Sequence, residues 1–197
     1  MVKVKRLIQS IIAVSASVIM VATGGTAAHS ATSYSEETPP PVEVGSLSQL
    51  TNAEADLLAS DDLKRVSVDP YTGDVTSVVP MSEAELNEEV FGSLPPQGSI
   101  STRAASPNCT STSQPCWHAA TPSINYRFTL GTTKGTWGAR KDFWTGNYYA
   151  KLCWIDPLPT NPFNPGTVCM PLRNGTKAWI QIGFTVTGKQ VNVSSIR

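Results

Sequence analysis

The chain of 197 residues has room for one ordinary domain or two very small ones. Its 15 basic and 15 acidic residues cancel, but they are spread unevenly along the chain. Residues 1–31 carry +3, residues 32–103 carry −10 and residues 104–197 carry +7. The charge is therefore not evenly balanced along the chain, and this asymmetry predicts that the parts of the chain have different roles.

The N-terminal residues follow the pattern of a secretory signal peptide. Three basic residues within positions 3–6 precede an apolar run from Leu7 to about Val21, and small residues follow up to Ala31. The run is short for a membrane span, and its flanks are typical of a cleaved segment. We therefore predict a signal peptide over residues 1–31 and a secreted, extracellular protein.

The acidic part of the chain divides into a lead-in, a small pro-segment and a linker. Residues 32–47 are polar and proline-rich, which predicts a disordered lead-in. Residues 48–91 predict a small α+β pro-segment. Residues 92–107 form a Pro/Gly/Ser-rich linker in which a processing protease can reach Arg103. The alternative is an intact hinge.

Short motifs support the α+β prediction for residues 48–91. Thr51 with Glu54 and Ser82 with Glu85 are two capping boxes, each of which predicts the start of a helix. Between them, apolar runs flank a Pro/Gly-rich turn at residues 69–74, which predicts a β-hairpin.

Residues 108–197 predict a small antiparallel β-sandwich or barrel, so the chain as a whole is expected to be mainly β. Apolar residues alternate with polar ones around residues 124–130, 148–154, 168–172 and 180–186, which is the period of half-buried strands. We expect turns at residues 131–135, Asn174-Gly175 and Thr187-Gly188-Lys189, and an irregular loop over the proline-rich residues 156–167.

All four cysteines lie in this cationic part, and an even number in an exported protein predicts two disulfides. We favour Cys109–Cys116 and Cys153–Cys169, which join neighbours in sequence. Cys153 and Cys169 lie opposite in parity to the main apolar stripe of their strands, so a cross-strand bond between them is sterically reasonable if those strands pair. There is no Cys-x2-Cys pair and His118 is the only nearby histidine, so we predict no metal site.

Catalytic motifs are scarce in the cationic domain. Beyond residue 103 it contains no glutamate, and Asp142 and Asp156 are its only carboxylates apart from the C-terminus. A pair of carboxyl groups for glycoside hydrolysis, a nucleophile elbow and a glycine-rich phosphate loop are therefore not indicated. We predict a protein that is not an enzyme and needs no cofactor, with a small secreted hydrolase using His118 held in reserve.

Cationic and aromatic residues alternate most densely over residues 140–151. Aromatic rings on an exposed face can stack on sugars or lie at a membrane interface, while lysine and arginine attract anionic polymers or lipids. Many of these aromatic residues must also fill the core. Strand parity places Tyr149 and Lys151 on the outward side. With three residues of the same stretch they make five candidates for surface binding: Arg140, Lys141, Trp144, Tyr149 and Lys151.

Two main classes of function follow. The first is a secreted, non-enzymatic effector, antimicrobial or toxin-like, whose cationic β domain binds an anionic cell-surface polymer or membrane. Its own acidic pro-segment is then an internal partner that masks the cationic face until the linker is cut, unless the acidic residues only keep the lead-in soluble. The second is an extracellular recognition module or inhibitor that binds a glycan or a protein through loop 156–167. We do not expect nucleic acid to be the partner.

Overall fold

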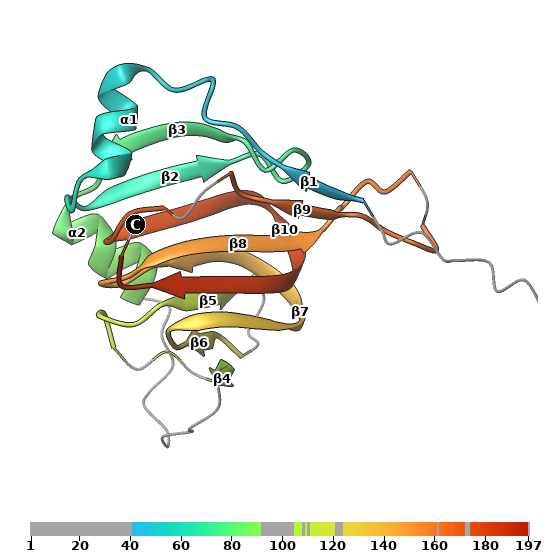
Figure 1. Cartoon of the computed structure of the whole chain (residues 1–197). Helices are drawn as coiled ribbons and strands as arrows, with labels where there is room; N and C mark the ends of the chain where they lie inside the picture. Colours follow the sequence, from blue (N-terminus) through green and yellow to red (C-terminus); the bar gives the residue numbers. More distant parts are fainter. Residues whose placement is uncertain are drawn as a thin grey trace, which may run out of the picture. The chain divides into compact units, whose positions relative to one another are not determined.

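The computed structural model describes residues 41–91, 105–107, 109, 111–120, 124–160, 162–171 and 174–196, and β-strands dominate them (Figure 1). The helical elements are α1 (Asn52–Ala59), α2 (Glu83–Leu86) and the π-helical turn η1 (Asn87–Phe91). The strands are β1 (Val42–Val44), β2 (Lys64–Val68), β3 (Val75–Pro80), β4 (Ala105–Pro107), β5 (Cys116–Ala119), β6 (Tyr126–Phe128), β7 (Gly131–Trp144), β8 (Tyr149–Ile155), β9 (Thr167–Cys169) and β10 (Ala178–Ser194).

Both predicted capping boxes are present and start the two helices. The Thr51 hydroxyl accepts a hydrogen bond from the Glu54 amide at 3.3 Å, and the Glu54 carboxylate accepts one from the Thr51 amide at 2.9 Å. Ser82 and Glu85 repeat this arrangement ahead of α2. Such reciprocal bonds satisfy amides that a helix start otherwise leaves without partners. The predicted hairpin is also confirmed, because β2 and β3 pair in antiparallel fashion.

Strand β10 is the centre of the sheet. The strands follow the order β1-β9-β8-β10-β7-β5-β6-β4, and β2 joins the beginning of β10 with β3 outside it. The pairs β1–β9 and β2–β10 are parallel, so the sheet is mixed. The expectation of a purely antiparallel domain is therefore wrong, because strands from the acidic part of the chain enter the same sheet.

Two of the predicted turns, at residues 187–189 and 174–175, do not form as hairpins. Residues 187–189 lie inside β10, which instead bends near Gly183, where φ is 60° and a glycine is favoured. No hairpin forms at Asn174-Gly175, since β8 lies between β9 and β10 in the sheet. Both predictions rested on local turn chemistry alone, whereas distant segments decide how the flanking strands pair.

One hydrophobic core includes both the acidic and the cationic parts of the chain. Its buried members from the first part are Leu58, Val66, Val68, Val75 and Val78. Its buried members from the second part include Trp117, Phe143, Leu152, Trp154, Ile180 and Ile182. Residues 48–91 therefore do not fold as a separate pro-segment. They contribute strands and core side chains to the same β fold, so in this structure they are not a separate partner that masks it.

A smaller core lies beneath α2 and η1. The fully buried Val90 packs there with Trp144 and Trp179, beside the disulfide Cys109–Cys116. Glu89 of η1 forms an ion pair with Arg65 of β2 at 2.5 Å, which fixes this helical segment to the sheet.

Several predicted segments lie outside the described residues. These are the signal peptide over residues 1–31, most of the lead-in over residues 32–47, and most of the linker over residues 92–107, including Arg103. Within the described part of the chain, no helix combines the length and the apolar character that crossing a bilayer requires.

Candidate functional site

Arg140, predicted to be on the surface, is 2% exposed. Its guanidinium donates to the carbonyl of Gly138 at 2.8 Å and to that of Ile124 at 2.8 Å, and it lies 5.2 Å from the centre of the Tyr126 ring. Burial lowers the pKa of this guanidinium. The predicted surface exposure is therefore wrong for Arg140, which instead joins the β5–β6 connection to β7.

The other four candidates are divided between core, surface and groove. Trp144 is 3% exposed and donates its indole hydrogen to the carbonyl of Thr112 at 2.6 Å, so its predicted exposure is also wrong. Lys141 is exposed and lies 3.6 Å from a carboxylate oxygen of Asp142. Tyr149 is half-buried at the start of β8. Of the five candidates, only Lys151 lines the groove described below.

His118, the residue held in reserve for hydrolysis, is buried in the smaller core. Its ring meets Trp179 edge to face with the centres 4.9 Å apart, and its Nε2 atom has no hydrogen-bond partner. Burial, with a contribution from the charge of Arg140, lowers the pKa of His118 to about 4. A ring that is only 6% exposed cannot reach a substrate in this structure, so the position of His118 does not favour the hydrolase alternative.

The low pKa of His118 predicts acid sensitivity. The unfolded chain binds a proton near pH 6.5 and the folded chain only near pH 4, so stability should fall as pH is lowered through this window. The loss should reach up to about 3 kcal/mol. His118→Phe keeps a ring against Trp179 and should remove this part of the pH dependence.

Urea unfolding of both proteins between pH 4 and pH 7 measures the difference. Asp142 is buried on the neighbouring strand β7, and burial raises the pKa of its carboxyl, which gives a slope of the opposite sign. Only the difference between wild type and His118→Phe is therefore informative. Parallel stability curves for the two proteins would refute the assignment.

A groove with a volume of about 720 Å³ lies on the outer face of β1, β9, β8, β10 and β7. Eleven residues line it: Val42, Val44, Lys134, Gly135, Thr136, Lys151, Cys153, Thr167, Cys169, Lys189 and Gln190. Three of them are lysines from three different strands, and none of these eleven is acidic. The volume falls within the range of small-molecule sites, about 300–1,000 Å³.

Strand alternation explains the floor of this groove. Residues directly opposite one another across the five strands are Val44, Cys169, Cys153, Gln190 and Lys134. Neighbours of these residues along the strands, such as Leu152 and Val191, point to the other face and are fully buried in the main core. The groove is therefore the back of the core sheet.

A β-bulge turns Lys189 toward the groove, although strict alternation with Gln190 would place it on the other face. Gly188 pairs with Trp154 and Gln190 pairs with Cys153, so two steps along β10 match one step along β8. Lys189 is the extra residue. A bulge re-aims the side chain of its extra residue, and both Lys189 and Gln190 consequently line the groove.

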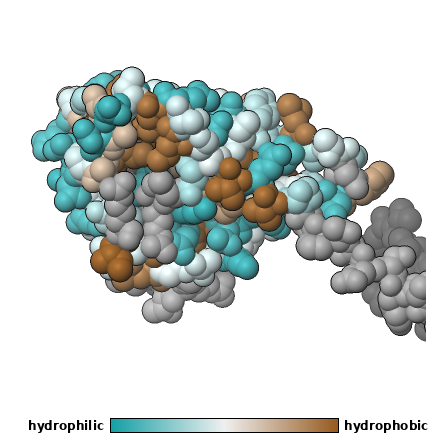
Figure 2. Space-filling view, turned by 45° about the horizontal axis from the view of Figure 1, so that its top comes forward, coloured by the Kyte–Doolittle hydropathy of each residue, from teal (hydrophilic) through white to brown (hydrophobic). Residues whose placement is uncertain are grey.

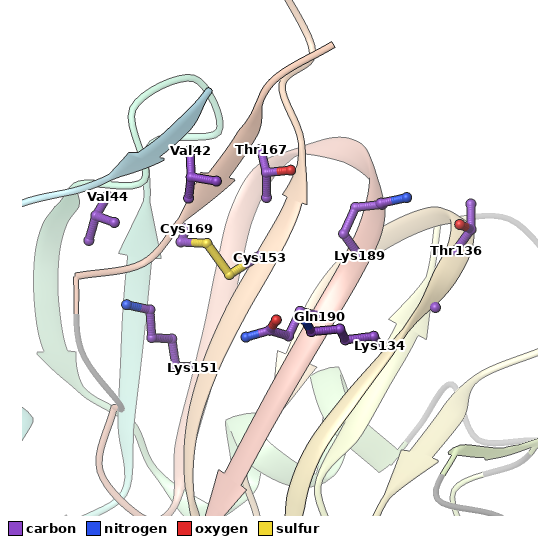
Figure 3. Close-up of a pocket in the computed structure, with 11 residues that line it drawn as sticks. Val42, Val44, Lys134, Thr136, Lys151, Cys153, Thr167, Cys169, Lys189 and Gln190 are labelled. Carbon is purple, nitrogen blue, oxygen red and sulfur yellow. A yellow bond between two sulfur atoms is a disulfide. The ribbon is translucent and has the colours of Figure 1, made fainter. Parts of the chain in front are cut away.

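The two sides of the groove differ in chemistry (Figure 3). Val42 and Val44 of β1 lie on one side of the disulfide, and Lys189 and Lys134 lie on the other. The two valines are 63% and 56% exposed. Lys151 lies below Val44, with its ammonium 3.5 Å from the carbonyl of Pro171. One side thus carries the two valines of β1 with Lys151 near its lower end, and the opposite side carries Lys134 and Lys189.

The disulfide between Cys153 and Cys169 forms the floor between these two sides. The two residues are directly opposite on β8 and β9, with Cα atoms 4.1 Å apart, which confirms the predicted cross-strand bond. The bond also ties the base of the loop that runs from Ile155 to Thr167. In that loop Leu158 is 70% exposed and Phe163 is 96% exposed.

Sequence reasoning missed Lys134 and Lys189 as groove residues because both were placed in predicted turns. Residues 131–135 were read as a turn, but they belong to the long strand β7. The β-branched residues Thr132, Thr133 and Thr136 were an available indication of a strand. The bulge at Lys189 had no comparable sequence pattern.

Within the described residues, no group of three or more histidine, cysteine, aspartate or glutamate side chains is arranged to hold a metal ion. The groove's chemistry is therefore carried by its ammonium groups, its amide and hydroxyl groups, and its valine side chains. Compared with protein-family models, curated proteins and solved structures, the chain matches none of them.

Proposed function

We propose that this protein is a secreted, non-enzymatic effector whose lysine-lined groove binds anionic groups on a cell surface. The observation that carries the proposal is the convergence of Lys134, Lys151 and Lys189 from three strands on one groove that has no acidic lining residue among those described. Compared with the surface predicted from sequence, the cationic site keeps Lys151 and replaces Arg140 and Trp144 with two other lysines. An antimicrobial or toxin-like role is the consequence we favour.

Electrostatics makes such binding moderate and dependent on salt. An exposed ion pair contributes about 0.2–1 kcal/mol, and charges in solvent are screened beyond about 8 Å at physiological ionic strength. A single small anion would therefore bind weakly, whereas a ligand that contacts several lysines at once would gain from all of them. A polymer or a surface that repeats its anionic groups fits this requirement.

Neutralising the lysines tests the proposal. We expect Lys134→Gln, Lys151→Gln and Lys189→Gln each to weaken binding of long-chain inorganic polyphosphate about two- to fivefold, and the triple variant to weaken it about tenfold or more. Lys177→Gln is the matched control, because Lys177 is exposed and lies outside the groove lining. Isothermal titration at 50 mM and 200 mM salt gives the affinities, and unchanged circular dichroism establishes that the variants fold. Equal binding by wild type and the triple variant would exclude the groove as the anion site.

The exposed loop supports a second candidate function. Leu158 and Phe163 place two large apolar side chains on a loop that a disulfide ties at its base, which suits recognition of a protein or glycan. Sedimentation with intact bacterial cells distinguishes the two candidates. Loss of cell binding in Phe163→Ser but not in the triple lysine variant would favour the loop. Leu130→Ser, at another exposed apolar position, is the control.

A further inference from the structure

The two sides of the groove differ in chemistry, and this difference limits the kinds of ligand that suit the groove. Lys134 and Lys189 supply positive charge on the side of β7 and β10, while Val42 and Val44 supply an exposed apolar wall on β1. The disulfide, which is also apolar, covers the floor between them. A purely ionic polymer would use the lysines and gain nothing from the valines.

Resting on the proposed anion-binding function, we infer that the groove binds a single-chain anionic amphiphile. Its anionic head lies between Lys134 and Lys189, and its alkyl chain crosses the disulfide toward Val42 and Val44. Gln190 and Thr136 lie beside the two lysines and supply an amide and a hydroxyl to the head. Head and chain are therefore recognised by different strands.

The two valines of β1 are exposed apolar residues. Figure 2 shows hydrophobic residues as separate patches among hydrophilic ones on the face that it presents. Val42 and Val44 are alternate positions of a three-residue edge strand in which every residue is exposed, so their side chains lie on the same face of that strand. Neither valine belongs to the core, because the buried residues of both hydrophobic clusters lie in other elements.

Alkyl phosphates of increasing length provide the test. At concentrations below micelle formation, we expect binding to strengthen about twofold for each added methylene, since an open groove covers one side of the chain and removes only part of its surface from water. Decyl phosphate, with four more methylenes, should therefore bind about sixteenfold more tightly than hexyl phosphate. Inorganic phosphate should bind most weakly, and the neutral amphiphile decyl maltoside should bind at least tenfold more weakly than decyl phosphate.

A double substitution tests where the alkyl chain of the ligand lies. The double variant Val42→Thr/Val44→Thr keeps the shape of both side chains and should flatten the dependence on chain length without changing polyphosphate binding. Val79→Thr is the matched control, because Val79 is also an exposed strand valine, 42% exposed, and does not line the groove. Isothermal titration of the full secreted chain measures each affinity.

The outcomes separate this inference from the proposed function. Lysine-dependent polyphosphate binding without any effect of alkyl chain length would overturn the amphiphile and leave the anion site in place. Equal binding of decyl maltoside and decyl phosphate would also overturn it, because the head would not be recognised. Absence of lysine-dependent binding for every probe would refute both.

Discussion

Residues 104–197, produced without the preceding part of the chain, will not reach the native fold. The missing part supplies five side chains to the main core, namely Leu58, Val66, Val68, Val75 and Val78. Burying an aliphatic side chain contributes about 1.5–3 kcal/mol, so the five together contribute about 10 kcal/mol. That is comparable to the whole stability of a typical domain, about 5–15 kcal/mol.

All five tryptophans lie in the isolated piece and report its state. In the complete protein Trp117 and Trp154 are fully buried and Trp179 is 2% exposed. We expect red-shifted tryptophan fluorescence, weak near-ultraviolet circular dichroism and no cooperative unfolding for residues 104–197 alone. Adding separately produced residues 32–103 should restore the native spectrum. A native near-ultraviolet spectrum of the isolated piece would show that the shared core is dispensable.

Replacing Trp154 by alanine should cost about 3–5 kcal/mol, the largest effect that we expect from a single substitution. Trp154 is fully buried on β8, and its indole donates to the carbonyl of Pro70 at 2.7 Å. The substitution therefore removes a large core side chain and the hydrogen bond that joins β8 to the β2–β3 turn.

Two further variants separate packing from hydrogen bonding at this position. Trp154→Phe keeps most of the volume but removes the donor, and should cost about 1–2 kcal/mol. Phe184→Ala, at a position that is 50% exposed, should change stability by less than about 1 kcal/mol. Guanidinium unfolding midpoints measure all three. If Trp154→Ala lowers stability no more than Phe184→Ala, the β2–β3 turn is not anchored through this residue.

The sequence allowed correct predictions wherever the determining contacts are local. The capping boxes at Thr51 and Ser82 act within three residues, and the β2–β3 hairpin depends on its own turn. Parity placed Cys153 and Lys151 together on the outer face of β8, and it supported the pairing of Cys153 with Cys169. These inferences required only the geometry of one element or two neighbours.

The same reasoning failed where distant segments decide the environment. Parity shows which side of a strand a residue faces, but not whether another layer covers that side. Trp144 faces away from the main core, yet the segment containing Val90 covers it and makes it part of a second core. The parallel pairing of β2 with β10 left no pattern in either strand, because its determinants lie in the packing of the whole domain.

The central position of β10 also sets the order in which the sheet can form. This strand, Ala178–Ser194, pairs with β2, β7 and β8, and it follows all three along the chain. During synthesis, these earlier strands therefore lack a principal neighbour until β10 has been made. Contacts that are so distant in sequence slow folding. The architecture thus delays closure of the core until β10 is available.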